Sequence, residues 1–105
     1  MLEQDPEDGT RLDIGTEFRV TWKIQNTSDS SWSTQDADVR FKEGTAMHTG
    51  PSVMDLYQSV PSDSTADITI TMKAPATEGY HIAYWSIQQG DKPLCTFYIE
   101  IFSKQ

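Results

Sequence analysis

The chain has 105 residues, of which 36% are hydrophobic and 10% aromatic, and its 16 acidic against 8 basic side chains give a formal net charge of −8. This length is typical of one small domain. The negative charge argues against nucleic acid and against an anionic membrane as partners, because both require a basic surface. A single Cys excludes a disulfide within the chain, and the aromatic content argues against disorder.

Apolar and polar residues alternate with a period of two through most of the chain, which is typical of strands with one face in the core. In residues 17–25, for example, Val20, Trp22 and Ile24 alternate with polar side chains. Clusters of Gly, Pro, Asn and Asp interrupt these runs about every 8–12 residues, the spacing typical of an all-β sandwich. The expected strands cover residues 17–25, 39–42, 66–73, 79–88 and 95–102.

Two segments do not follow this alternation. Residues 1–8 contain four acidic side chains and a Pro, and we expect them to form a flexible acidic leader. Between Pro51 and Pro61, four side chains lie at helical spacing, namely Val53, Leu56, Tyr57 and Val60. A helix of about two turns is marginal in stability. A strand or an irregular connection is therefore the preferred expectation there, with a helix as the alternative.

Several short motifs follow one another in the order and spacing of a known family. They are Asp8-Gly9-Thr10, Gly15, Phe18, Trp22-Lys23-Ile24, Asn26-Thr27, Trp32, Gly50-Pro51-Ser52, Ala74-Pro75, Gly79 and Trp85. This set resembles the four-tryptophan (FW) domain, the immunoglobulin-like domain of a selective-autophagy cargo receptor and of many bacterial multidomain proteins. Residues 50–53 are more similar to the bacterial members. The resemblance spans residues 8–102 and implies one immunoglobulin-like antiparallel β-sandwich domain over residues 9–103.

Several positions depart from the pattern of that family. Tyr98 takes the place of the fourth Trp, and Pro93-Leu94 replaces a usual Phe-Gly. His81 stands where a Tyr is common, and Ser28 stands where a Gly usually follows Asn-Thr. The implied fold does not depend on these positions. A partner-binding surface near the last strand, however, does not carry over from the family.

The core is expected to form around large side chains on the inward-facing positions of the strands. A buried indole removes on the order of 200 Å² from water, so two or three of them fill much of the space between sheets that pack about 10 Å apart. The expected core residues are Phe18, Trp22, Trp32, Ile70, Trp85 and Ile99.

Residues that carry catalysis are few and dispersed. Cys95 occupies an inward position of the last expected strand, and we expect a small buried hydrophobe there. His81 follows a turn Gly, which predicts a structural hydrogen bond to the neighbouring loop, and His48 lies several elements away. Because no nucleophile, base and orienting group fall together, and no Cys and His cluster, we expect no enzyme, no cofactor and no metal site.

Acidic residues and one sequon each offer a further hypothesis. Calcium requires about six to eight converging oxygens, and no calcium-loop motif is present, so the acidic groups are expected to form a solvated surface. The sequence Asn26-Thr27-Ser28 matches an N-glycosylation sequon but is also typical of a tight turn, which is the preferred interpretation. The acidic groups considered are Asp5, Glu7 and Asp8, and Asp29, Asp36 and Asp38.

One expected surface is apolar. Ile82 and Tyr84 share the outward-facing positions of one strand, and Tyr98 and Phe102 share those of the next. If the two strands pair as an antiparallel hairpin, these four residues form one exposed stripe, and such patches mark partner sites on small domains. The alternative is that the leader, a loop or a neighbouring domain covers the stripe.

The function expected from these observations is that of a non-catalytic protein-binding module within a larger protein. A protein or peptide segment of basic or neutral character is the expected partner, because the surroundings are acidic. We expect no nucleic-acid binding, no membrane insertion, and a monomer for the isolated domain. The alternatives are a carbohydrate or cell-surface adhesion module, in which exposed Tyr or Trp rings stack on sugars, and an architectural spacer.

Overall fold

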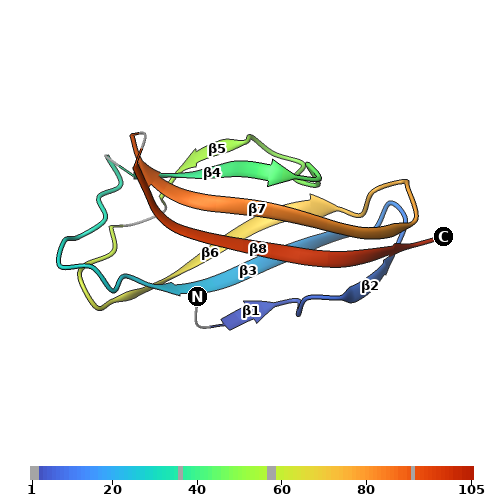
Figure 1. The fold of residues 1–105 in the computed structure, drawn as a ribbon, viewed down its shortest axis with the longest axis horizontal. Helices are drawn as coiled ribbons and strands as arrows, with labels where there is room; N and C mark the ends of the chain where they lie inside the picture. Colours follow the sequence, from blue (N-terminus) through green and yellow to red (C-terminus); the bar gives the residue numbers. More distant parts are fainter. Residues whose placement is uncertain (1–2, 36, 57–58, 91) are drawn as a thin grey trace.

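The fold consists of strands arranged in two stacked sheets (Figure 1). A computed structural model describes residues 3–35, 37–56, 59–90 and 92–105, and every regular element in these ranges is a strand, which confirms the expected all-β sandwich. The strands are β1 (Glu3–Asp5), β2 (Thr10–Asp13), β3 (Glu17–Gln25), β4 (Ala37–Gly44), β5 (Val53–Asp55), β6 (Thr65–Lys73), β7 (Gly79–Gln89) and β8 (Lys92–Lys104).

One sheet has three strands in the order β1-β3-β6, and the other has five in the order β2-β8-β7-β4-β5. All neighbouring strands are antiparallel except β2 and β8, which are parallel. The chain between Asp5 and Thr10 therefore crosses from the edge of one sheet to the edge of the other. Part of the expected acidic leader, residues 3–5, is a strand paired with β3, because the backbone groups at that sheet edge would otherwise lack partners.

Alternation along β3 and β6 produces the core. Every second residue of β6 is buried, and in β3 the side chains of Val20, Trp22 and Ile24 are fully buried. Five of the expected core residues lie in this buried cluster, and Phe18 is half-buried and packs against it. The five are Trp22, Trp32, Ile70, Trp85 and Ile99.

The segment around residues 53–60 contains a short strand rather than the alternative helix. Strand β5 pairs antiparallel with β4, and its neighbour Leu56 is buried. Val60 forms an isolated antiparallel bridge with Trp32, with both backbone hydrogen bonds at 2.9 Å. Residues 57–58, which carry Tyr57 of the expected helical pattern, lie outside the described residues.

The sequon at Asn26 is a structural turn. Asn26 is fully buried, and its Nδ2 donates to the carbonyl oxygens of Ser30 at 2.8 Å and Val60 at 2.9 Å. Its Oδ1 accepts hydrogen bonds from the backbone N–H and the hydroxyl of Ser28 at 3.0 and 2.6 Å. Both amide hydrogens are used and no solvent reaches the side chain, so this geometry excludes a glycan at Asn26 and confirms the turn.

The connection between β4 and β5 joins the two sheets. The backbone N–H of Thr45 donates to Ile82 in the five-stranded sheet at 2.8 Å. The backbone N–H of Thr49 donates to the carbonyl oxygen of Thr71 at 3.1 Å, and the backbone N–H of Lys73 donates to the carbonyl oxygen of Met47 at 2.9 Å. Residues 45–49 therefore cover the open edge of β6 and bring a loop to one end of the sandwich.

Replacement of Trp22 by Ala tests whether the core depends on this indole. The ring is fully buried, lies 4.7 Å from the ring of Phe97, and its Nε1 donates to the carbonyl of Tyr98 at 2.9 Å. We expect Trp22→Ala to cost about 3–5 kcal/mol, which is comparable to the stability of a small domain. The variant should show no cooperative transition in thermal unfolding followed by circular dichroism. Trp22→Phe, which keeps an aromatic ring in the core, should lower the free energy of unfolding less than Trp22→Ala does. A cooperative Trp22→Ala melt within a few degrees of the parent would contradict the prediction.

Gly44 provides a second test, with Gly9 as its matched control. Both have positive φ, +97° at Gly44 and +82° at Gly9. A Cβ at Gly44 would overlap the carbonyl oxygen of Ile82, whereas a Cβ at Gly9 meets nothing within 4 Å. Gly9→Ala should therefore cost only the backbone strain of about 1–2 kcal/mol. Gly44→Ala should add about 1–3 kcal/mol of steric strain, measured by urea denaturation. Equal losses for the two variants would show that the contact with Ile82 relaxes freely.

Candidate functional site

An aromatic surface lies on the outward face of β7 and β8. It consists of Tyr80, Ile82, Tyr84, Tyr98 and Phe102, and we call these five residues the aromatic surface. The register between the strands sets Tyr80 opposite Phe102 and Tyr84 opposite Tyr98. Since side chains alternate across a strand, the inward positions between them point to the core. The four residues expected from the sequence thus lie on one face of one hairpin.

Two cross-strand aromatic pairs organise this surface. The ring centroids of Tyr84 and Tyr98 are 5.6 Å apart with an interplanar angle of 43°, and those of Tyr80 and Phe102 are 4.9 Å apart at 78°. Tyr80 is 66% exposed and Tyr98 is 43% exposed. Ile82, Tyr84 and Phe102 are half-buried. The two exposed rings therefore stand at opposite ends of the surface.

Sequence reasoning missed two members of this region. Tyr80 lies two residues before Ile82 and so shares its outward position, a signal that was present in the sequence. Arg11 comes from β2, and its Cζ lies 5.0 Å from the centroid of the Phe102 ring, a cation–π arrangement. No local pattern indicates that β2 pairs in parallel with β8, so Arg11 could not be assigned to this surface from the sequence.

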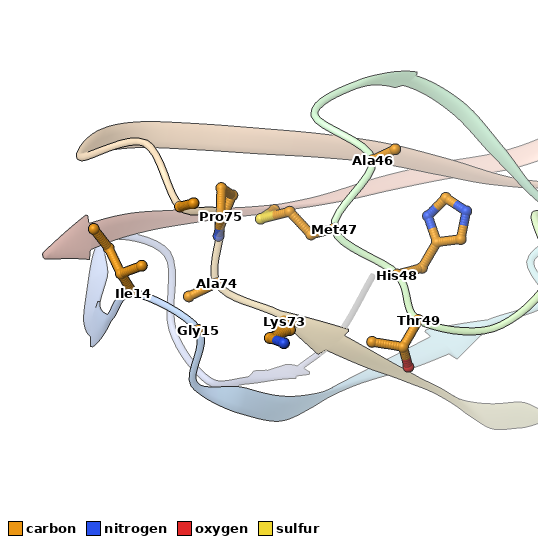
Figure 2. Close-up of a pocket in the computed structure, with 10 residues that line it drawn as sticks. Ile14, Gly15, Ala46, Met47, His48, Thr49, Lys73, Ala74 and Pro75 are labelled. Atoms are coloured by element: carbon orange, nitrogen blue, oxygen red, sulfur yellow. The ribbon is translucent and has the colours of Figure 1, made fainter. Parts of the chain in front are cut away.

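A pocket of about 490 Å³ lies at the end of the sandwich where the β4–β5 connection meets the end of β6 (Figure 2). Figure 2 shows Met47 pointing toward Pro75, whereas the ring of His48 points away from Met47. The walls of the pocket are mainly apolar, and the basic side chain of Lys73 also lines it. The lining residues are Ile14, Gly15, Ala46, Met47, His48, Thr49, Lys73, Ala74, Pro75 and Ala76.

His48 is held in an aromatic cluster rather than aimed at the pocket. Its ring centroid is 5.0 Å from that of Phe41 and 5.0 Å from that of Trp85, and its Nε2 lies 2.8 Å from the hydroxyl of Ser52. Its Nδ1 is buried and has no hydrogen-bond partner. Protonation would place an unpaired N–H there in apolar surroundings. Burial accordingly lowers the pKa of His48 below its ordinary value.

The contacts of His81 and Cys95 indicate structural roles for both side chains. His81 Nε2 donates to the carbonyl of Thr77 at 2.8 Å, and its Nδ1 lies 3.2 Å from the hydroxyl of Thr45. The expected hydrogen bond from His81 to the neighbouring loop is therefore confirmed. Cys95 is half-buried and packs against the core, and burial raises the pKa of its thiol. A raised pKa keeps sulfur in the less reactive thiol form at neutral pH.

The acidic side chains are candidate ligands for a cation. In residues 3–35, 37–56, 59–90 and 92–105, no three His, Cys, Asp or Glu side chains converge in a way that could hold a metal ion. Asp36, one of the acidic residues considered from the sequence, lies outside the described residues. Nor do the described residues include a helix long and apolar enough to span a membrane.

The surroundings of His48 predict a pH dependence of stability. Below pH about 6.5 the unfolded chain protonates this side chain, whereas the folded chain, with its lowered pKa, protonates it only at lower pH. The unfolded state then binds more protons, so this group lowers the free energy of unfolding as pH falls below about 6.5. His48→Phe keeps a ring beside Phe41 and Trp85 but cannot titrate. Urea denaturation between pH 7 and pH 5 should show a steeper loss for the parent than for His48→Phe. Parallel pH profiles would contradict the prediction.

A family model described as "Ig-like domain from next to BRCA1 gene" matches residues 6–101. The proteins named "Next to BRCA1 gene 1 protein" from Pongo abelii and Homo sapiens are each 24% identical to the chain over 110 residues. Those alignments cover 99% of this chain but only 12% and 11% of the two relatives. The Mus musculus protein is 24% identical over 107 residues, 96% of this chain and 11% of its own length. The chain thus spans a small part of these long relatives.

Solved structures share the fold at low sequence identity. SSP-19, an MSP-domain protein like family member in Caenorhabditis elegans, has a TM-score of 0.55 at 13% identity and covers 99% of this chain and 100% of its own. The CARDB domain of PF1109 from Pyrococcus furiosus has a TM-score of 0.59 at 10% identity and covers 93% of this chain and 91% of its own. At such identities the likeness concerns the fold alone.

These comparisons correct the assignment made from the sequence. The resemblance to the four-tryptophan domain, and to its bacterial members in particular, is wrong as a family assignment, since the matching model describes a different domain family and the relatives are animal proteins. The fourth tryptophan position, occupied by Tyr98, had already departed from that pattern. The immunoglobulin-like sandwich is confirmed, and the chain belongs to the family of Ig-like domains from next to BRCA1 gene.

Proposed function

We propose that this chain is a non-catalytic protein-binding module and that its aromatic surface contacts a protein or peptide segment. The observation that supports this most directly is the two cross-strand aromatic pairs, Tyr84 with Tyr98 and Tyr80 with Phe102, each with one exposed ring, on one face of a single hairpin. Aromatic side chains contribute strongly to protein interfaces because they bury a large area at a low cost in rotamer entropy.

The hairpin prepares these rings for binding. β7 and β8 pair without a register shift from Gly79↔Ser103 to Ile87↔Cys95, so the backbone beneath the aromatic surface is held by a continuous ladder. Each tyrosine also packs on its cross-strand neighbour, which restricts its rotamers before a partner arrives. A surface ordered in advance loses less entropy on association than a flexible one.

Charge selects the kind of partner. The chain carries a net charge of −8, and Glu100 lies opposite Ile82 between the two aromatic pairs. Arg11, above Phe102, introduces a positive charge at one end. A segment with apolar side chains and basic or neutral flanks complements this pattern, whereas nucleic acid would be repelled.

The family context agrees with a module inside a longer protein. The relatives are about eight to nine times longer than the segment they share with this chain, as the 11–12% coverage implies, so the binding of a partner by one Ig-like domain would link that partner to the rest of the protein. As an isolated domain the chain is proposed to be a monomer, because copies with the same net charge repel each other.

A carbohydrate-binding role has weaker support. Sugar rings stack on a flat aromatic platform, but the two aromatic pairs are tilted at 43° and 78° rather than coplanar. A purely architectural spacer would not need exposed aromatic pairs on one face, since singly scattered rings would serve equally well. Both alternatives predict that substitutions on the aromatic surface leave protein binding unchanged.

The test compares Tyr84→Asp and Tyr98→Asp with Thr71→Asp as a control that adds the same charge. Thr71 is exposed and lies on β6, in the other sheet. Proteins captured quantitatively by the immobilised parent chain should be retained by Thr71→Asp and reduced about tenfold or more by each tyrosine variant, because a carboxylate in the aromatic surface would have to be desolvated.

Thermal melts of all three variants should remain cooperative, which separates lost binding from lost folding. If the set of captured proteins is the same for Tyr84→Asp, Tyr98→Asp and the parent, the aromatic surface is not the binding site.

A further inference from the structure

Strand β8 has one edge that is only partly paired. On one side it pairs with β7 from Ser103 to Lys92, with one register shift between Ile87 and Gln88. On the other side, β2 covers only Ile101 to Lys104. Within the part of the chain that the structure describes, no strand pairs with this second side of residues 92–100. Beyond the short strand β2, residues 92–100 of β8 therefore form the edge of the five-stranded sheet (Figure 1).

The hydrogen bonds beyond β2 show which backbone groups face this edge. The N–H of Glu100 donates to the Asp8 carboxylate at 3.0 Å, and its carbonyl accepts from the N–H of Gly9 at 2.8 Å. The carbonyl of Tyr98 accepts from Trp22 Nε1 at 2.9 Å. Because backbone direction alternates along a strand, Thr96 faces the same edge. The N–H of Tyr98 and both backbone groups of Thr96 have no strand partner among the described residues.

We propose that this edge of β8, centred on Thr96 and Tyr98, binds an extended basic segment of a partner protein as an added strand. Addition of a strand to an exposed sheet edge derives its affinity from main-chain hydrogen bonds and its specificity from alternate side chains. The inference goes beyond the aromatic surface, since it uses backbone groups in the plane of the sheet rather than side chains on its face.

The unpaired stretch of β8 is long enough for one added strand. Lys92 and Pro93 are exposed at the start of β8, and such residues protect a sheet edge from unwanted pairing. Gly9 and Asp8 occupy the edge at Glu100. Residues 94–98 therefore remain, about the length of an average strand. The edge is protected at its start and left accessible beyond it.

Charge determines the occupant. Gln4 of β1 lies opposite Trp22, and its Nε2 donates at 2.8 Å to the same Asp8 carboxylate that accepts from Glu100. This links β1, with its acidic Glu3 and Asp5, to the border of the open edge. Basic side chains on the added strand would complement these carboxylates. A second copy of the chain carries the same charge of −8 and would be repelled.

Trp22 supplies a reporter for this edge. Its indole N–H is bonded to the Tyr98 carbonyl, so a strand added at Tyr98 should change the chemical environment of that single side-chain proton. The experiment uses the 105-residue chain labelled with ¹⁵N and a blocked seven-residue probe peptide, Lys-Thr-Val-Lys-Val-Thr-Lys. Addition of the peptide should shift the amides of Thr96 and Tyr98 and the indole resonance of Trp22, and should slow hydrogen exchange at both amides.

Two matched peptides test the chemistry on the unaltered protein. The same sequence with Glu in place of Lys should bind at least tenfold more weakly. A version with alternate backbone amides methylated cannot complete the ladder and should produce no shift at Thr96. Equal binding of the acidic peptide, or no shift at Thr96 and Tyr98 with millimolar basic peptide, would overturn the proposal.

Two variants test the edge itself. Thr96→Pro removes the free N–H and should weaken peptide binding at least tenfold, whereas Thr96→Val keeps that N–H and should bind like the parent. Tyr84→Ser, which alters the aromatic surface, should leave peptide binding intact, so failure of the edge and failure of the proposed function are distinguishable. Peptide-induced shifts confined to Tyr80, Ile82, Tyr84 and Phe102 would overturn the proposal, because the peptide would then bind the aromatic surface. Shifts at Thr96 that depend on protein concentration without peptide would also overturn it, because a second copy of the chain would then occupy the edge.

Discussion

The contact between Trp22 and β8 is the interaction on which the rest of the structure depends. The indole comes from the three-stranded sheet, packs 4.7 Å from Phe97, and donates to the backbone carbonyl of Tyr98 in the five-stranded sheet. One side chain thus supplies apolar contact area and satisfies a polar group at the sheet edge. Without a disulfide between the sheets, this contact at the border of the core holds β3 and β8 at a defined separation.

The position of the aromatic surface follows from the same strand. Phe97, Ile99 and Ile101 are buried, so the residues between them must face outward. A shift of β8 by one residue would place Tyr98 in the core and expose Phe97, at a large cost in burial. The core therefore fixes the register of β8 and, with it, the face on which the tyrosines stand.

Much of this arrangement follows from local alternation in the sequence. The period of two over residues 17–25 predicted β3 with the observed bounds, and the parity of Ile82 and Tyr84 placed them on the observed face. β1 and β2 were not predicted as strands because each is short, and β2 in addition pairs with residues at the far end of the chain. Arg11 was missed for that reason, since only the parallel register of β2 brings it above Phe102.

The polar side chains that most often take part in catalysis or binding have structural roles in this fold. The groups that remain accessible to a partner are therefore the outward side chains and the edge backbone groups of β8. Asn26 and His81 use their polar atoms to hold turns, and His48 packs among aromatic rings. β8 presents side chains perpendicular to the sheet and backbone groups along its open edge. Because these directions are orthogonal, a partner on the aromatic surface and a strand on the edge would meet mainly at Tyr98, whose ring belongs to the first site and whose N–H belongs to the second.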